Sequence, residues 1–89
     1  MAFHDIDPQA PIHLLIIPKK HIASIMDVKQ DESHLLGKIA LLAQQLAQEN
    51  NIDASGFRMV VNTGDEGGQS VAHLHFHLMG GRPFVWPPG

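Results

Sequence analysis

The stretch His73-Leu74-His75-Phe76-His77-Leu78-Met79 decides the fold of this chain. Its histidines alternate with Leu and Phe, and alternation at a period of two is typical of a β-strand with one buried face. On such a strand the three histidines lie in a row on one face, and the apolar side chains between them point into a core. A Gly-rich loop, residues 64–70, precedes this strand, and Gly80-Gly81 follows it.

Three interpretations of the histidine row are open. One is a strand with histidines on its solvated face, although three in strict alternation seldom arise by chance. Another is a metal site, since neutral imidazole is the commonest metal ligand. A strand rises about 3.3 Å per residue, so His73 and His77 start roughly 13 Å apart and could hardly meet at one ion. The chain also has no Cys to supply a further ligand. We therefore predict neither a metal nor another cofactor.

The third interpretation is nucleophilic or acid–base chemistry on an anionic group, because histidine can act as nucleophile, base or acid near neutral pH. The middle ring could attack a substrate while an outer ring handles a proton or a negative oxygen. The loop before the strand fits this chemistry, since glycines let backbone N–H groups approach a phosphate closely. Ser70 adds a hydroxyl donor. We favour this interpretation.

Length and composition limit the class of protein. The 89 residues make one domain at most, and a core of that size is marginal without help. With no Cys, no disulfide provides that help. A net charge of −3 does not indicate the excess of basic residues that is typical of nucleic-acid-binding proteins. The longest apolar run, residues 14–17, is far too short to span a membrane, and the N-terminus lacks a signal-peptide pattern. We expect a soluble intracellular protein without nucleic-acid or membrane partners.

The remaining sequence predicts further strands and one long helix. A strand is expected at residues 12–17, buried on both faces because Leu and Ile run continuously there. Residues 32–50 form the one clear helix, with Asp31 as N-cap and an apolar stripe at 3.6-residue spacing. Residues 57–62 alternate as a strand that would pair antiparallel with the histidine strand. Residues 1–6 are predicted to be part of a further strand. The pattern predicts an α+β domain, an antiparallel sheet with one helix against it.

The histidine stretch resembles the signature of the histidine triad (HIT) family, in which His-x-His-x-His is followed by two apolar residues. The resemblance runs nearly end to end and implies a single HIT domain over residues 1–89, paired into a homodimer. Hint-like proteins usually carry a helix and a hairpin strand before the segment that corresponds to residues 1–6. Both elements are therefore expected to be absent from this chain. The segments that narrow the resemblance to the histidine triad nucleotide-binding (Hint) branch are Phe3-His4-Asp5-Ile6, Ile17-Pro18-Lys19-Lys20-His21, Val60-Val61-Asn62, Gly67-Gly68-Gln69-Ser70-Val71 and Trp86-Pro87-Pro88-Gly89.

The resemblance also implies an activity. It implies a purine nucleotide-binding hydrolase, similar to adenosine 5'-monophosphoramidase, that cleaves nucleoside phosphoramidates at the P–N bond through a nucleotidyl-histidine intermediate. Its expected ligands are a purine nucleoside monophosphate and its phosphoramidates, such as AMP joined to an amine or to lysine. Two alternatives stay open: a dinucleoside polyphosphate hydrolase, which the Trp-Pro-Pro-Gly tail disfavours, and a non-catalytic nucleotide-binding or scaffolding module. The expected location is the cytoplasm, with the nucleus also open for a eukaryotic protein.

The resemblance finally implies roles for single residues. His75 attacks phosphorus, His77 interacts with the phosphate and leaving group, and His73, linked to His13, holds the tautomer of its neighbour. Attack requires a neutral nitrogen, so the other nitrogen of His75 is predicted to donate to an acceptor such as a backbone carbonyl. The other expected site residues are Phe3 and Ile6 at the base, Asp5 at the ribose, Asn62, Gly68 and Ser70 around the rest of the nucleotide, and Trp86 near the partner subunit's site.

Overall fold

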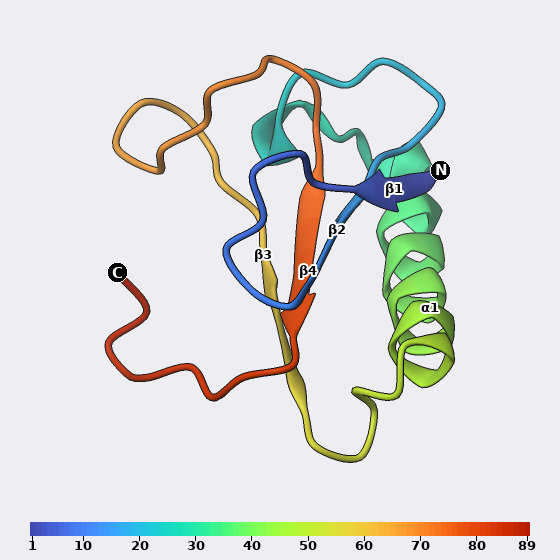
Figure 1. The fold of residues 1–89 in the computed structure, drawn as a ribbon. Coiled ribbons are helices and arrows are strands. Elements are labelled where there is room, and N and C mark those ends of the chain that lie inside the picture. Colours follow the sequence, from blue (N-terminus) through green and yellow to red (C-terminus); the bar gives the residue numbers. More distant parts are fainter.

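The computed structural model describes residues 1–89 as an antiparallel sheet with one long helix against it (Figure 1). The sheet has four strands in the order β1-β2-β4-β3, and each neighbouring pair is antiparallel. This confirms the predicted α+β architecture and the predicted pairing of the histidine strand with the strand before it. The elements in chain order are β1 (Ala2–His4), β2 (Ile12–Ile16), the single-turn helices η1 (Ile25–Asp27) and η2 (Gln30–Glu32), α1 (His34–Glu49), β3 (Phe57–Val60) and β4 (Phe76–Gly80).

The start of the long helix differs from the prediction. Asp31 lies inside η2 and is not the N-cap; Ser33 occupies that position before α1. The side chain of Glu32 accepts the backbone N–H of Lys29 over 3.0 Å and forms an ion pair with Lys20, so η2 is held as a separate turn. The hydrogen bond between Lys20 and Glu32 raises the pKa of the lysine and lowers that of the carboxyl group.

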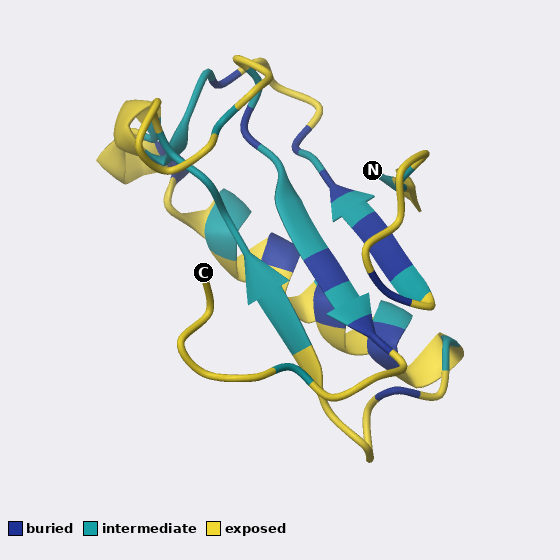
Figure 2. Cartoon of the chain, turned by 60° about the vertical axis from the view of Figure 1, so that its left-hand side comes forward, coloured by how far each residue is buried: buried dark blue, intermediate teal, exposed yellow.

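The core lies between α1 and one face of the sheet (Figure 2). Leu14 and Leu78 come from the central strands, and Ile39 and Ala43 come from the helix. Leu74 and Leu78 are almost completely buried, which confirms that the apolar residues between the histidines enter the core. The prediction that residues 12–17 are buried on both faces is confirmed only in part, because the helix covers one face; on the other face His13 is buried, whereas Leu15 is half-buried.

The other face of the sheet carries the histidine side chains. His77 lies within β4, opposite Leu15 of β2. The strand begins only at Phe76, so His73 and His75 precede it and do not continue a regular row as predicted. The backbone explains this difference. The N–H of Leu74 donates to the carbonyl of Ile22 over 2.6 Å, so the chain at this point is bonded to the loop after β2 and not to a strand of the sheet.

Candidate active site

His75 is held in one tautomer by the backbone. Its Nδ1 lies 2.7 Å from the carbonyl oxygen of His73. A carbonyl oxygen can only accept a hydrogen bond, so Nδ1 carries the hydrogen and Nε2 of the neutral ring keeps a free lone pair. The backbone carbonyl that was predicted as the partner of His75 is therefore that of His73.

His73 is anchored beside the loop that follows β2. Its Nε2 lies 3.3 Å from the carbonyl oxygen of Pro18, which makes that nitrogen a donor. The ring of His21 meets it edge-on, with 5.0 Å between centroids. The sequence interpretation gave His21 no role, although His21 belongs to one of the segments that carried the resemblance. The structure therefore adds His21 to the surroundings of the site.

His13 is buried on the histidine face and contacts His77. Its Nε2 lies 2.9 Å from His77 Nδ1, and the ring centroids are 5.1 Å apart. The antiparallel register places His13 opposite Met79, so its ring reaches His77 diagonally across the two strands. The prediction that His13 is linked to His73 is therefore wrong, since His73 lies beyond the opposite end of β4.

Asp5 faces the same pair of histidines. Its Oδ2 lies 3.5 Å from His13 Nε2 and 4.0 Å from His77 Nδ1. The pKa of His77 is lowered by partial burial first, then by its neighbours His75 and His13, and Asp5 only partly opposes this. His77 is thus held in its neutral form at neutral pH.

The group of Asp5, His13 and His77 has the composition of a metal site, with its potential ligand atoms within 4.8 Å of one another. A metal on His13 Nε2 would require a hydrogen on Nδ1 of the same ring. The backbone N–H of Gln9 instead donates to that Nδ1 over 3.0 Å. The arrangement therefore fits a chain of hydrogen bonds better than it fits a metal ion.

A cavity of about 270 Å³ opens beside His73 and His75. Phe3 lines it, as predicted for a base contact, whereas Ile6 is fully exposed and lies outside it. The sequence interpretation missed the other apolar lining residues, although alternation along residues 13–17 places two of them on the histidine face. These missed residues are Leu15, Ile17 and Val71.

The Gly-rich loop is closed by its own hydrogen bonds. The N–H of Gly68 donates to the carbonyl of Asp65 over 3.1 Å, so in this conformation it is not free to contact a nucleotide, the role predicted for Gly68. Gln69 braces the loop, because its side chain accepts from Gly64 N–H and donates to the carbonyl of Ala23. Sequence reasoning gave Gln69 no role. Of the other predicted residues, Ser70 is exposed and Asn62 is half-buried.

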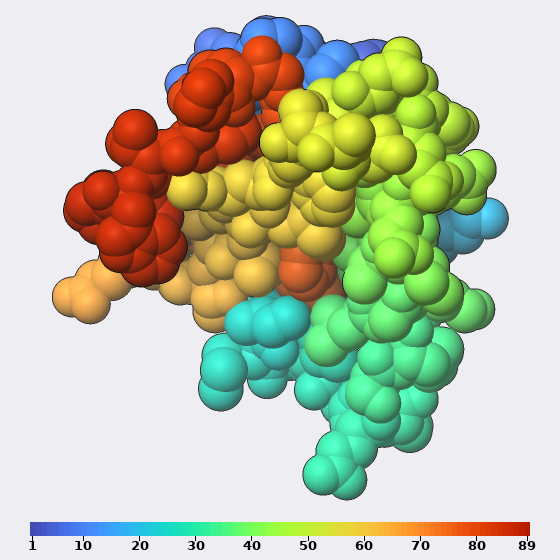
Figure 3. Space-filling view, turned by 90° about the horizontal axis from the view of Figure 1, so that it is seen from below, coloured from blue at the N-terminus to red at the C-terminus, as the bar shows by residue number.

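The C-terminal tail lies along the side of the molecule away from α1 (Figure 3). The ring of Phe84 lies near two guanidinium groups, at 5.1 Å from that of Arg58 and 4.3 Å from that of Arg82. Arg58 also donates to the carbonyl of Val85 over 3.0 Å. The tail is thereby fixed to the sheet, while the side chain of Trp86 stays 83% exposed.

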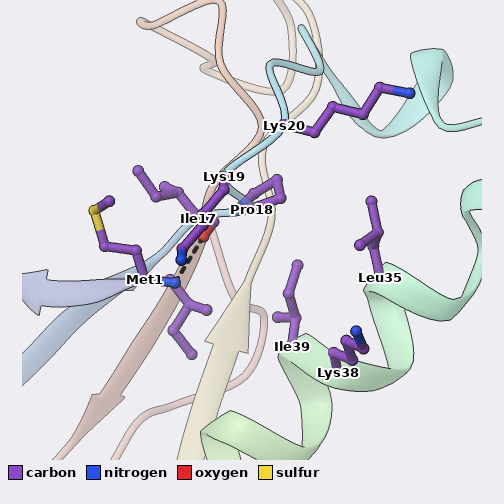
Figure 4. Close-up of a pocket in the computed structure, with 9 residues that line it drawn as sticks. Met1, Ile17, Pro18, Lys19, Lys20, Leu35, Lys38 and Ile39 are labelled. Carbon is purple, nitrogen blue, oxygen red and sulfur yellow. Dashed lines mark hydrogen bonds between the residues drawn. The ribbon is translucent and has the colours of Figure 1, made fainter.

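A second cavity, of about 320 Å³, lies between the start of β1, the end of β2 and α1 (Figure 4). Met1, Leu35 and Ile39 give it an apolar wall, and Lys19 and Lys38 also line it. No histidine lines this cavity, whereas His73 and His75 line the first one.

The fold and the clustered histidines define a protein of the histidine triad type. A HIT domain is matched over residues 1–84. An uncharacterized HIT-like protein of Synechococcus elongatus is 46% identical over 89 residues, all of this chain and 77% of that protein. The chain therefore belongs to the HIT family. No helix in it combines the length and apolar character needed to cross a membrane.

Solved structures support the same assignment. A HIT family hydrolase from Legionella pneumophila superposes with a TM-score of 0.96 at 57% identity, covering 99% of this chain and 79% of that one. A histidine triad nucleotide-binding protein from Candida albicans gives a TM-score of 0.77 at 32% identity, covering 97% of this chain and 66% of that one. The fold is thus one on which hydrolases of this family are built.

Proposed function

We propose that the chain is a hydrolase of the Hint branch that cleaves the P–N bond of purine nucleoside phosphoramidates. The observation that carries the proposal is the tautomer of His75, whose Nδ1–H is held by the carbonyl of His73 while Nε2 keeps its lone pair. His75 also lines the cavity whose apolar wall suits a purine base. The hydrolase from Legionella pneumophila and the nucleotide-binding protein from Candida albicans support the activity and the ligand class.

The reaction proceeds in two steps. His75 Nε2 attacks the α-phosphorus, the P–N bond breaks, and the amine leaves with the bonding electron pair and a proton delivered from solvent through the exposed Ser70 hydroxyl. A water molecule then attacks the nucleotidyl-histidine. The bond to His75 breaks, its lone pair is restored, and the water's proton returns to solvent as the nucleoside monophosphate departs.

The nucleotide is placed by the cavity and by the ends of the strands. Phe3 and the neighbouring apolar residues contact the base. Asp5 accepts the ribose hydroxyls, which requires its carboxylate to turn from the histidines that it faces in the free protein. Asn62 and Ser70 complete the nucleotide contacts. Gly68 can contribute its N–H only when its bond to Asp65 opens.

The direct test is turnover of adenosine 5'-phosphoramidate by the purified chain, with AMP and ammonia measured by chromatography and a coupled assay. We expect AMP release that continues unchanged after exhaustive EDTA treatment, because no step uses a metal. A dinucleoside polyphosphate is the comparison substrate and should be cleaved more slowly. Binding of AMP without turnover would contradict the proposal and favour the non-catalytic module. Loss on chelation, restored by zinc, would reverse the metal assignment.

The homodimer is part of the same proposal. Val85 and Trp86 are mostly exposed on a tail that is otherwise tied to the sheet, and large exposed apolar side chains commonly mark an interface. We expect the parent chain to sediment as a dimer at micromolar concentration and Trp86→Ala to shift the equilibrium toward monomer. Leu41→Ala, at a site on α1 that is 65% exposed, is the control and should leave the dimer intact. A monomeric parent chain would rule the dimer out.

A further inference from the structure

We propose that the second cavity, at the junction of β1, β2 and α1, binds a medium-chain aliphatic carboxylate. The hydrocarbon chain lies against the apolar wall of the cavity, and the carboxylate lies between Lys19 and Lys38 at its rim. No histidine lines this cavity, so the inference goes beyond the proposed function and does not depend on it. The wall, the volume and the charge of the cavity each favour such a ligand.

The wall of the second cavity is apolar on both sides. Leu35 and Ile39 come from α1, and the residues opposite them come from the end of β2 and the segment that follows it (Figure 4). Ile39 is buried beneath the cavity, whereas Leu35 is only half-buried. The uncharged lining residues are Met1, Ile16, Ile17, Pro18, Leu35 and Ile39. A hydrocarbon chain placed on this surface removes apolar area from water on both partners, which favours binding.

The volume of the second cavity sets the size of the ligand. Its volume of about 320 Å³ is near the lower end of the range of roughly 300–1,000 Å³ that is usual for ligand pockets. If each methylene group takes about the space of a water molecule in the liquid, roughly 30 Å³, the cavity holds a chain of about ten groups. A fatty acid such as decanoate fits this volume, and a lipid with two long acyl chains does not.

The rim of the second cavity is positively charged, although the whole chain has a formal net charge of −3. Three of the six Lys and Arg residues line the cavity, and no acidic residue does. Lys20 forms an ion pair with Glu32, whereas Lys19 and Lys38 form no ion pair. A carboxylate has two oxygens that accept hydrogen bonds, one for each of these two ammonium groups. The charge therefore selects an anionic head group.

The first cavity also has an apolar wall, so it is the competing location for an aliphatic chain. Ile17 lines both cavities and does not distinguish them. Leu35 and Ile39 line only the second cavity, whereas Leu15 and Val71 line only the first. The methyl groups of these four residues therefore report which cavity is occupied.

Methyl NMR of the full chain, labelled at Ile, Leu and Val, tests the site. Decanoate is added well below the concentration at which it forms micelles. We expect saturable shifts of the Leu35 and Ile39 signals, with those of Leu15 and Val71 unchanged. Octanoate should bind about tenfold more weakly, because two methylene groups fewer are buried. Acetate has the head group without the chain, and decyltrimethylammonium has the chain with the opposite charge, so neither should give saturable shifts.

Substitution of the rim lysines tests the charge. Lys19→Ala and Lys38→Ala should each weaken decanoate binding by up to about fivefold, the usual upper limit for one exposed ion pair. Reversing both charges, in the double variant Lys19→Glu/Lys38→Glu, should abolish detectable binding. Lys29→Ala is the matched control, since this lysine is exposed and lies outside the cavity, and it should bind decanoate as the parent chain does.

Three results would overturn the inference. Shifts at Leu15 and Val71 in place of Leu35 and Ile39 would assign the ligand to the first cavity. Equal affinity of the parent chain and the double charge-reversal variant would show that the lysines do not hold the head group. Co-sedimentation of the chain with phosphatidylglycerol vesicles, without any shift on addition of decanoate, would show that the basic rim contacts a lipid surface and not a free fatty acid.

Discussion

Replacing His75 with alanine is expected to abolish measurable turnover of a nucleoside phosphoramidate. The substitution removes the atom that bonds to phosphorus, so the loss should exceed the roughly 10²–10⁴-fold that follows removal of a general acid or base. His75 is singled out by geometry. Its Nδ1 donates to the carbonyl oxygen of His73 over 2.7 Å, which leaves Nε2 unprotonated. The ring also lines the cavity of about 270 Å³.

The intermediate gives a more direct measurement than the rate. The enzyme is quenched during turnover of a phosphoramidate labelled in the nucleotide, and the adduct is located by mass spectrometry of peptides. Label is expected on His75. His73→Ala is the matched control, since that ring donates to the carbonyl of Pro18 and lies beside His21, and its loss should slow turnover less. Label on another residue, or a His75→Ala enzyme that keeps most of its activity, would contradict the mechanism.

The features that the sequence predicted well are those that depend on local periodicity. Alternation across residues 73–79 placed Leu74 and Leu78 in the core and the histidines on the opposite side, and both residues are almost completely buried. The spacing of apolar residues likewise predicted the single long helix, which covers the apolar face of the sheet opposite the histidines. Burial of one face is a property of each element by itself, so it can be derived from a short window of sequence.

The contacts among the histidines could not be derived in that way. Which residue meets His13 depends on the register between β2 and β4, strands that are far apart in the chain, and a shift of two residues would change the partner. The donor from Gln9 depends on the turn between β1 and β2 and on Arg82 from the end of the chain. Gly68 illustrates the same limit, because its N–H is satisfied by the fold of its own loop.

Leu78→Ala is expected to destabilise the chain by about 2–5 kcal/mol, the usual cost of removing a buried leucine side chain and leaving a cavity. Leu78 is 0% exposed and lies in β4, one of the two central strands, opposite Leu14 on one side and Met59 on the other. On the helix side it belongs to the same cluster as Ile39 and Ala43. Few other side chains could fill the space, because the core of so small a chain has a single layer.

Leu78→Ala is the substitution for which we expect the largest effect on folding. A domain of this size has a free energy of unfolding of about 5–15 kcal/mol, so the loss is a large fraction of the total. Urea unfolding followed by circular dichroism, at one fixed protein concentration because dimer formation would add to stability, gives the difference. Leu41→Ala on the exposed side of α1 should change stability by less than about 0.5 kcal/mol. Equal losses in the two variants would show that Leu78 does not hold β4, and with it His77, against the helix.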